Sequence, residues 1–314
     1  MLVSTEACIP ILLCPRTKET LKRTSSDTED FLESPTLQYR FLNGQPILID
    51  FSDSVLSEDS VFASAAGSPI ERKKASGLMT PIKRLLSPQK STTRNNVRRL
   101  VADLQQLPEP ARVLIVGGGT IGQGMAPLYE HPRVQLYSFD VYGTELTQFV
   151  ADAHHMPLPD DFFDAVVIQA VLEHVLQPAQ VVSEIWRVLR PAGLVYAETP
   201  FMQQVHEGPY DFTRFTESGH RYLFRHFAHV ASGASGGPGI QFMWAADYLA
   251  RSVLRSATAG KIAKLAFFWT QYLDALIPAP YGADGASGVY FYGRKSQTAI
   301  SPRDIINYYQ GAQR

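Results

Sequence analysis

The pattern of hydrophobic and polar positions becomes regular from residue 97 onward. Residues 97–107 carry apolar side chains at helical spacing and are followed by two prolines, which predicts a helix that ends there. Four short runs of apolar, β-forming residues come next, at 112–116, 134–139, 165–169 and 194–198. Residues 178–189 again show a helical apolar stripe. Strands that are apolar throughout and alternate with helices predict an α/β fold, with a doubly wound parallel sheet covered on both faces.

The last third of the chain predicts a helical insertion and a closing strand. Residues 240–278 contain two apolar helical stretches, which are expected to pack near the ligand pocket. Their aromatic residues favour a core position or a homodimer face over a membrane patch. Residues 288–294 (GVYFYGR) resemble the strand of a final β-hairpin. The main domain is therefore expected to span residues 97–296, and residues 297–314 are expected to form a peripheral tail.

Composition shifts twice before the regular region begins. Residues 1–52 hold short apolar runs around a polar stretch, which suggests a small N-terminal domain. Residues 53–96 are rich in Ser, Lys, Arg and Pro and hold too few large apolar residues to build a core, so they are expected to be a linker. Its basic residues from 72 to 99 are expected to be solvated surface, with a phosphate- or membrane-contacting role as the alternative.

Composition and charge narrow the class of protein. The chain has 314 residues with 29 Lys and Arg against 30 Asp and Glu, a balance that argues against a nucleic-acid partner. Two cysteines exclude a disulfide scaffold and fit a reducing compartment. Glu6, Cys8 and Pro10 interrupt the short apolar start, so no secretory signal is expected. No apolar run is long enough for a transmembrane segment, and a cytoplasmic protein is predicted.

A glycine-rich loop follows the first predicted strand. Glycines at 117, 118, 119 and 122 let the backbone turn sharply and approach a ligand, with the N-terminus of the next helix expected to face it. Asp140 lies 21 positions after Gly119, at the carboxyl end of the second strand, where its carboxylate can accept hydrogen bonds from both hydroxyls of a ribose. The loop also satisfies the G-x-G-x-x-G fingerprint of dinucleotide-binding proteins, so at this point both a dinucleotide and another ribose-containing cofactor fit the pattern.

Three motifs after this loop carry a family resemblance. They are D-A-x-x-x-P-L-P-D-x-x-F-D at 152–164, L-E-H-V at 172–175 and E-I-x-R-V-L-R-P at 184–191. In this order they closely resemble the class I S-adenosylmethionine-dependent methyltransferases, in particular the type 11 subgroup that includes quinone-biosynthesis methyltransferases. The resemblance covers about 110–200 and extends loosely to 295. It implies a Rossmann-like seven-stranded sheet, S-adenosylmethionine as cofactor, and methyl transfer as the activity.

The resemblance also implies positions for the cofactor-binding residues. They are Gly117, Gly118, Gly119, Asp140, Val141, Asp152, Ala153 and Gln169. By this resemblance Asp140 holds the ribose hydroxyls, Asp152 accepts from the adenine amino group, and Gln169 lies near the methionine end. The chain departs from the family at Ile115 and Ile121, where members usually carry an acidic residue and a further glycine.

The loop after the fourth apolar run offers the candidate chemistry. Methyl transfer requires orientation of the acceptor, and a base only where the acceptor must lose a proton. Residues 199–216 are dense in His, Tyr, Asp and Arg, and a similar stretch recurs in methyltransferases of bacterial glycan chemistry. The predicted acceptor is therefore an oxygen or nitrogen of a small or glycan-linked molecule. His206 is the candidate general base, and Tyr210, Asp211 and Arg214 are the candidate substrate-binding residues. In the alternative, Asp211 and Arg214 form an ion pair that staples the loop.

No metal site is predicted. Glu173 and His174 are neighbouring potential ligands, but no third ligand follows at helical spacing. Residues 8–51 weakly resemble the zinc-ribbon-like domain that activates some methyltransferases, yet Thr17 stands where the partner of Cys14 would be. This segment is therefore expected to be a degenerate, metal-free zinc ribbon or a lid on the substrate side, with a thiol nucleophile as a remote alternative.

Two other functions stay open at this point. One is an NAD(P)-dependent oxidoreductase of the Rossmann type, which the glycine fingerprint alone would allow. The other is a non-catalytic binding module or partner subunit that keeps the cofactor fold, which the departures at Ile115 and Ile121 would allow.

Overall fold

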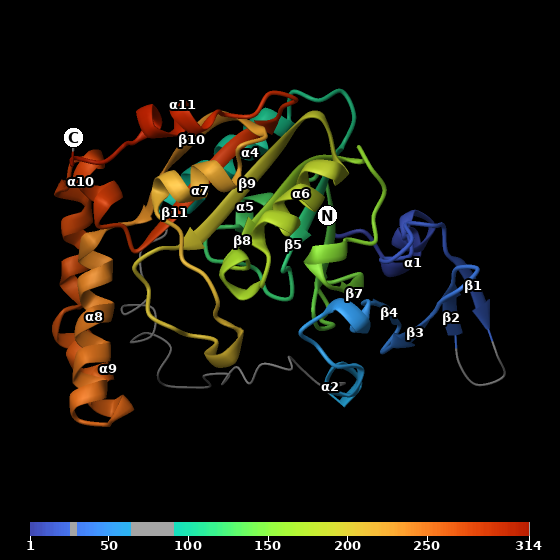
Figure 1. Ribbon diagram of the computed structural model, residues 1–314, viewed down its shortest axis with the longest axis horizontal. Coiled ribbons are helices and arrows are strands. Elements are labelled where there is room, and N and C mark those ends of the chain that lie inside the picture. The colour runs from blue at the N-terminus through green and yellow to red at the C-terminus, as the bar shows by residue number, and fades with distance from the viewer. Residues whose placement is uncertain (26–29, 64–90, 314) are drawn as a thin grey trace.

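The computed structural model describes residues 1–25, 30–63 and 91–313. In this part of the chain eleven strands form one sheet in the order β1-β2-β3-β4-β7-β6-β5-β8-β9-β11-β10 (Figure 1). The strands are β1 (Lys22–Ser25), β2 (Asp30–Glu33), β3 (Gln38–Leu42), β4 (Gln45–Leu48), β5 (Ala111–Val116), β6 (Val134–Asp140), β7 (Phe149–Ala151), β8 (Phe163–Gln169), β9 (Leu189–Pro200), β10 (Phe227–Gly236) and β11 (Gly288–Lys295).

Seven of these strands form the doubly wound sheet that the sequence predicts. Strands β7, β6, β5, β8 and β9 run parallel, β11 is antiparallel to β9, and β10 is antiparallel to β11. The α/β prediction is confirmed, and the four predicted apolar runs lie in β5, β6, β8 and β9. Strands β7 and β10 have no clear signal in the pattern, because β7 has three residues and β10 is rich in Ala, Gly and Ser.

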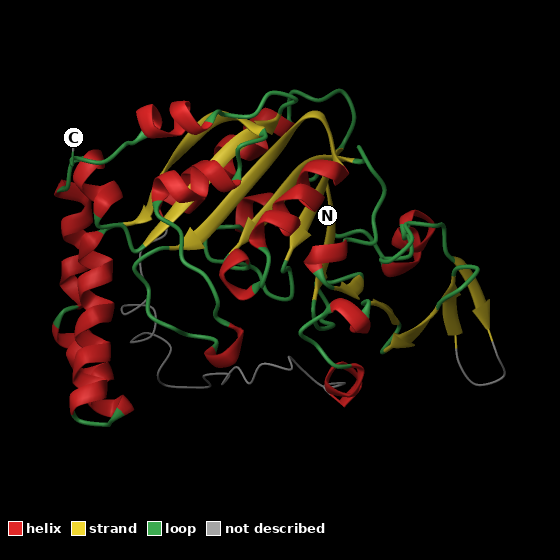
Figure 2. Cartoon of the chain, in the orientation of Figure 1, coloured by secondary structure: helices red, strands yellow, loops and turns green. Residues whose placement is uncertain are grey.

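Helices cover both faces of the sheet (Figure 2). The α-helices are α1 (Thr5–Cys8), α2 (Glu58–Ala63), α4 (Ser91–Leu104), α5 (Ala126–Tyr129), α6 (Pro178–Val188), α7 (Glu217–Leu223), α8 (Pro238–Val253), α9 (Ala257–Ala266), α10 (Ala279–Asp284) and α11 (Pro302–Tyr308). The 3-10 helices are η1 (Ile9–Ile11), η2 (Phe51–Asp53), η3 (Ala153–His155), η4 (Leu172–His174), η5 (Gly208–Tyr210) and η6 (Phe268–Leu276).

Alternate residues of β5 divide the core between the two faces. Val113 and Ile115 pack with the apolar stripe of α4, whereas Leu114 and Val116 pack with α6 and the N-terminal residues. This is the two-residue period of a strand that is buried on both sides. The helix predicted at 97–107 is α4, which begins earlier than predicted, at Ser91.

The sequence analysis was wrong to expect a helix directly after the glycine loop. Residues 117–125 form no helix, and the α5 helix that follows has four residues. Five glycines lie between 117 and 124, and each costs about 1 kcal/mol in a helix relative to alanine. Residues 141–148 likewise join β6 to β7 without a helix. The loop, rather than a helix N-terminus, therefore faces the carboxyl end of the sheet.

The N-terminal segment extends the sheet rather than standing apart from it. Strand β4 pairs in parallel with β7, and the backbone N–H of Val3 donates to the carbonyl of Leu136. Cys8 and Cys14 are buried in the main core, and burial raises the pKa of the Cys8 thiol to about 12. Burial acts in the same direction on Cys14, but hydrogen bonds with Thr17 and Tyr39 outweigh it and lower the pKa of that thiol. The thiol nucleophile and the degenerate zinc ribbon both stay predictions. Of the predicted linker, residues 58–63 form α2 and residues 91–96 open α4, while 64–90 lie outside the described residues.

The predicted helical insertion is a helical arm at one end of the sheet, orange in Figure 1. The arm consists of α8, α9 and η6. The second of the two apolar stretches predicted within 240–278 divides at Phe267 into α9 and η6. Both carboxylate oxygens of Asp274 accept backbone N–H groups at the start of α8, at 2.6 and 3.0 Å, which fixes η6 against α8. In the predicted tail, Tyr308 of α11 donates a hydrogen bond to Glu217 and so docks on α7. No helix among the described residues combines the length and apolar character needed to span a bilayer.

Candidate active site

A cavity of about 560 Å³ opens at the carboxyl ends of the parallel strands. Its lining comes from the ends of β5, β6, β8 and β9, from the loop at 201–216, and from Trp244 of α8. Ligands of open α/β sheets bind at this edge, and the volume lies within the range of about 300–1,000 Å³ typical of small-molecule sites. Six of the eight predicted cofactor residues line the cavity: Gly117, Asp140, Val141, Asp152, Ala153 and Gln169.

The glycine loop packs so closely that positions 117, 118 and 119 have no room for a side chain. Gly117 has φ +75°, and a Cβ there would lie 2.2 Å from Cγ2 of Val171. Gly118 and Gly119 do not line the cavity, and a Cβ there would meet Ser138 at 2.0 Å and Tyr142 at 2.6 Å respectively. The backbone of this loop therefore forms part of the cavity wall, as the sequence analysis expected.

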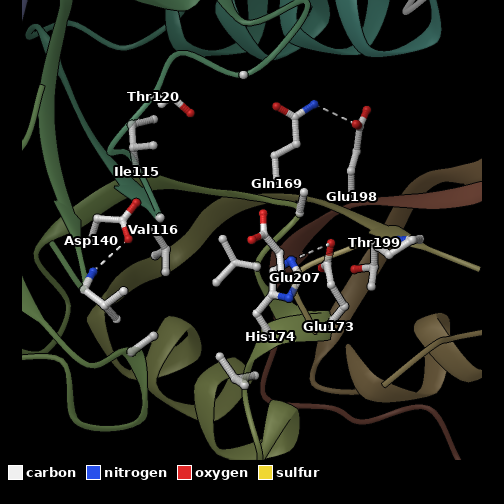
Figure 3. A pocket seen from close by; sticks show the side chains of 18 of the residues that line it. Ile115, Val116, Thr120, Asp140, Gln169, Glu173, His174, Glu198, Thr199 and Glu207 are labelled. Carbon is white, nitrogen blue, oxygen red and sulfur yellow. Dashed lines mark hydrogen bonds and ion pairs between the residues drawn. The ribbon is translucent and has the colours of Figure 1, made fainter. Parts of the chain in front are cut away.

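Asp140 ends β6 and faces the cavity (Figure 3). Its Oδ2 accepts the N–H of Gly119 at 2.8 Å, and its Oδ1 accepts the N–H of Val141 at 2.7 Å. Asp140 thus fastens the glycine loop and presents its carboxylate to the cavity.

Asp152 is held more fully by the protein. Its Oδ2 accepts from Ser54 at 2.6 Å, and its Oδ1 accepts from the backbone and ring nitrogens of His154 at 3.0 and 2.5 Å. Burial opposes the charge, but hydrogen bonds from His154 and Ser54 outweigh it and lower the pKa of the Asp152 carboxyl. Ser54, together with Val55 and Leu56 of the cavity lining, brings the N-terminal segment to the pocket.

A buried carboxylate that the sequence analysis missed lies beside Gln169. Glu198, near the end of β9, is 4% exposed and accepts from Gln169 Nε2 at 2.7 Å and from Thr93 at 2.6 Å. Tyr196 also donates to it, and burial together with the Glu198 charge raises the pKa of the tyrosine. The available signal was positional, because Glu198 ends an apolar strand as Asp140 does.

The four predicted residues of the loop at 201–216 have two different roles in the structure. Asp211 and Arg214 form a two-pronged ion pair, with one contact at 2.9 Å, and neither lines the cavity. This is the stapling arrangement that the sequence analysis kept as an alternative. Burial opposes the charge of Asp211, but the Arg214 hydrogen bond outweighs it and lowers the pKa to about 2. Tyr210 and His206 do line the cavity.

Glu173, His174 and His206 form a cluster in the same cavity. One donor atom from each lies within 4.8 Å of the other two. The expectation of no third ligand overlooked His206, which is remote in sequence but folds back over η4. Burial is the main cause that lowers the pKa of His174.

The cavity lining is strongly acidic. It includes the carboxylates of Asp140, Asp152, Glu173, Glu198 and Glu207. Among the described lining residues none is Lys or Arg. Such a lining favours a cationic ligand and disfavours an anionic one.

Comparison with known proteins identifies the central segment. Residues 116–197 match the family model described as "Methyltransferase domain". A "Probable S-adenosylmethionine-dependent methyltransferase" of Mycolicibacterium smegmatis is 51% identical over 45 residues, which are 14% of this chain and 18% of the relative. The demethylmenaquinone methyltransferase of Clavibacter sepedonicus is 43% identical over 54 residues, which are 17% of this chain and 22% of the relative. The chain thus spans about a fifth of the length of these curated relatives.

Solved structures show a more distant similarity. A Haemonchus contortus phosphoethanolamine N-methyltransferase has a TM-score of 0.45 at 14% identity, covering 70% of this chain and 57% of that one. A Burkholderia thailandensis 1,6-didemethyltoxoflavin-N1-methyltransferase has a TM-score of 0.40 at 14% identity, covering 88% of this chain and all of that one.

Proposed function

We propose that this chain, whose residues 116–197 match the model of a methyltransferase domain, transfers the methyl group of S-adenosylmethionine to an oxygen or nitrogen of a small or glycan-linked acceptor. The observation that carries the proposal is the acidic cavity beside the glycine loop. S-adenosylmethionine is the cofactor of this domain class and supplies an activated methyl group on a positively charged sulfonium. Five carboxylates around the cavity fit a ligand with that charge.

The residues of the cavity fit the separate parts of the cofactor. Asp140 lines the cavity at the end of β6, where an acidic side chain can bind the two ribose hydroxyls, and the glycine backbone gives the close approach that this part requires. Asp152 and Ala153 both line the cavity, and the family resemblance assigns the adenine ring to them. Glu198, oriented by Gln169 and Thr93, supplies a carboxylate for the ammonium group of the methionine part. Glu198 thereby replaces the first-strand acid whose position holds Ile115.

The acidic lining also argues against the oxidoreductase alternative. NAD(P) carries a pyrophosphate, and the described lining offers no Lys or Arg side chain to neutralise it. Five carboxylates in the same cavity would repel that group. The missing helix after the glycine loop removes the helix N-terminus on which a pyrophosphate ordinarily rests.

The acceptor side of the cavity is formed by the loop at 201–216. His206 and Tyr210 line the cavity, while Asp211 and Arg214 fix the loop that carries them. A neutral acceptor with hydroxyl or amino groups fits this polar, acidic wall better than a phosphorylated one. His206 is positioned to take a proton from a hydroxyl acceptor if no other group activates it.

The test is methyl transfer itself. Purified protein is incubated with S-adenosylmethionine and a panel of neutral sugars, nucleotide-linked sugars, phenols and amines, and release of S-adenosylhomocysteine is measured. The proposal expects release that depends on one acceptor class and is lost in Asp140→Ala. Cofactor binding without transfer to any class would instead support the non-catalytic binding module.

A further inference from the structure

We propose that Glu173, His174 and His206 form a binding site for a divalent transition-metal ion on the acceptor side of the cavity. The site rests on geometry alone, and only the role of the ion in acceptor binding rests on the proposed function. The three residues come from two separate segments, since Glu173 and His174 lie on η4 and His206 lies on the loop that folds over it.

The distances between the three side chains are those of ligands around an ion. Nε2 of His174 lies 3.6 Å and Nε2 of His206 lies 3.9 Å from Oε1 of Glu173. Both separations exceed the range of about 2.7–3.2 Å for an N–H···O hydrogen bond. Two ligands at tetrahedral angles, each about 2.1 Å from a zinc-sized ion, lie about 3.4 Å apart. Small side-chain shifts therefore suffice to place an ion between all three.

The hydrogen bond of His174 fixes which ring nitrogen faces Glu173. Nδ1 of His174 lies 2.6 Å from the carbonyl oxygen of Tyr210. A carbonyl oxygen only accepts, so Nδ1 carries the proton and the neutral ring presents the lone pair of Nε2. A metal-bound histidine is ordinarily oriented by such a bond to a backbone carbonyl.

His206 is held by a carboxylate and a backbone carbonyl. Its Nδ1 lies 3.2 Å from Oδ2 of Asp211 and 3.3 Å from the carbonyl oxygen of Gln204, and its backbone N–H donates to Oδ2 of Asp211 at 2.9 Å. Asp211 is held in turn by Arg214, so the ion pair that staples the loop also positions the imidazole. The carboxylate–histidine arrangement leaves Nε2 of His206 directed at Glu173. Asp211 and Arg214 are thus positioning residues.

The ligand set indicates the kind of ion. Two imidazoles and one carboxylate suit Zn²⁺, Co²⁺ or Mn²⁺ better than Mg²⁺ or Ca²⁺, which prefer oxygen ligands throughout. Three protein ligands leave a coordination position open, as in catalytic rather than structural sites. All three residues line the cavity, so the open position faces it.

An ion in this position gives the acidic cavity a way to bind an acceptor through oxygen. Coordination to the ion would lower the pKa of an acceptor hydroxyl, so that its proton could pass to solvent water and leave an oxygen ready for methylation. His206 would then act as a ligand, and a separate general base would not be required. This deepens the proposed function without depending on it for the ion itself.

The experiment is a calorimetric titration of Co²⁺ into metal-free, full-length protein, with the visible absorption of bound Co²⁺ as a second readout. The wild type is compared with His206→Ala and His174→Ala. His155→Ala is the matched control, because His155 also contacts a carboxylate, Asp53 at 2.9 Å, but does not line the cavity. His206 lies on a loop, so its variant should fold even if a change at the buried Glu173 does not.

The expected result is one equivalent of Co²⁺ bound by the wild type and by His155→Ala, with at least tenfold weaker binding by the other two variants. The proposal is overturned if the wild type shows no saturable binding at 1 mM Co²⁺, or if His206→Ala and His174→Ala bind as tightly as the wild type. S-adenosylhomocysteine is titrated into the same preparations. If the protein binds S-adenosylhomocysteine but not Co²⁺, only the metal site is refuted. If it binds Co²⁺ but not S-adenosylhomocysteine, only the proposed function is refuted.

Discussion

The Oδ2 atom of Asp140 accepts the backbone N–H of Gly119 at 2.8 Å, so the carboxylate assigned to the ribose also fastens the glycine loop. The position of the Asp140 carboxylate and the conformation of the glycine loop therefore depend on each other. A change at Asp140 removes a ligand contact and loosens the wall of the cavity at the same time.

Substitution of Asp140 by alanine is expected to weaken cofactor binding about a hundredfold. Two charge-assisted hydrogen bonds contribute about 1.5–3 kcal/mol each, and every 1.4 kcal/mol is tenfold. From sequence alone the stability loss is expected to be under about 1 kcal/mol. The bonds to Gly119 and Val141 raise this to about 1–2 kcal/mol. Calorimetry and melting curves test both, with Asp140→Asn as the milder variant; wild-type affinity in Asp140→Ala would refute the ribose assignment.

Gly117 and Gly44 allow the backbone strain to be separated from the clash. Both have positive φ, +75° and +79°, but a Cβ at Gly44 meets nothing within 4 Å. Gly44→Ala is expected to lose about 1–2 kcal/mol of stability through strain and to bind cofactor normally. Gly117→Ala is expected to lose more stability and at least tenfold in affinity, because Val171 is stiff and cannot move aside cheaply. Equal behaviour of the two variants in denaturation and binding assays would contradict the packing described for the loop.

Glu198→Gln is expected to weaken binding of S-adenosylhomocysteine about tenfold by removing the charge that faces the ammonium group. The comparison ligand is 5′-methylthioadenosine, which lacks the amino-acid part and should bind the variant and the wild type equally. Calorimetry with both ligands makes the comparison. A similar loss for both ligands would mean that Glu198 supports the cavity and does not contact the ammonium group.

Stability is expected to fall as the pH drops below about 6.5 because of His220. This imidazole is buried in α7, and burial lowers its pKa to about 3 from an ordinary value of 6.5. Between these pH values His220 is protonated in the unfolded chain but not in the folded chain. The free energy of unfolding therefore rises with pH across this window. At pH 5.5 the loss is about 1.4 kcal/mol.

The variant His220→Gln removes this titration and can keep a hydrogen bond to Thr199, whose hydroxyl lies 3.0 Å from the ring. Urea unfolding at pH 7.5 and pH 5.5 measures the change. The variant should lose less stability between the two pH values than the wild type does. An identical loss in both proteins would place the acid sensitivity elsewhere.

The central sheet could be predicted because each of its main strands is marked by a run of apolar residues in the local sequence. Strands β5 and β8 are apolar on both faces, and the glycine loop and Asp140 stand at the ends of such strands. Strand β7, with three residues, and the short α5 helix could not be predicted, because tertiary packing rather than periodicity sets their length. The sheet extension by β1–β4 was likewise hidden, since strand pairing over long separations leaves no local pattern.

Only the part of the candidate site that lies at the ends of predicted strands could be predicted from the sequence. Asp140 and Gln169 end strands whose position the pattern reveals, so their common edge followed from the fold. The pairing of His206 with Glu173 depends on how an irregular loop folds back, which no spacing rule describes. Glu198 also ends a predicted apolar run, but its position alone does not reveal that Thr93 and Gln169 converge on its carboxylate.

The most direct test of the account is a calorimetric comparison of S-adenosylhomocysteine and NAD on one preparation of the protein. The acidic cavity predicts that S-adenosylhomocysteine binds at one site per chain and that NAD binds at least a hundredfold more weakly. Tighter binding of NAD than of S-adenosylhomocysteine would contradict the account and return the oxidoreductase interpretation.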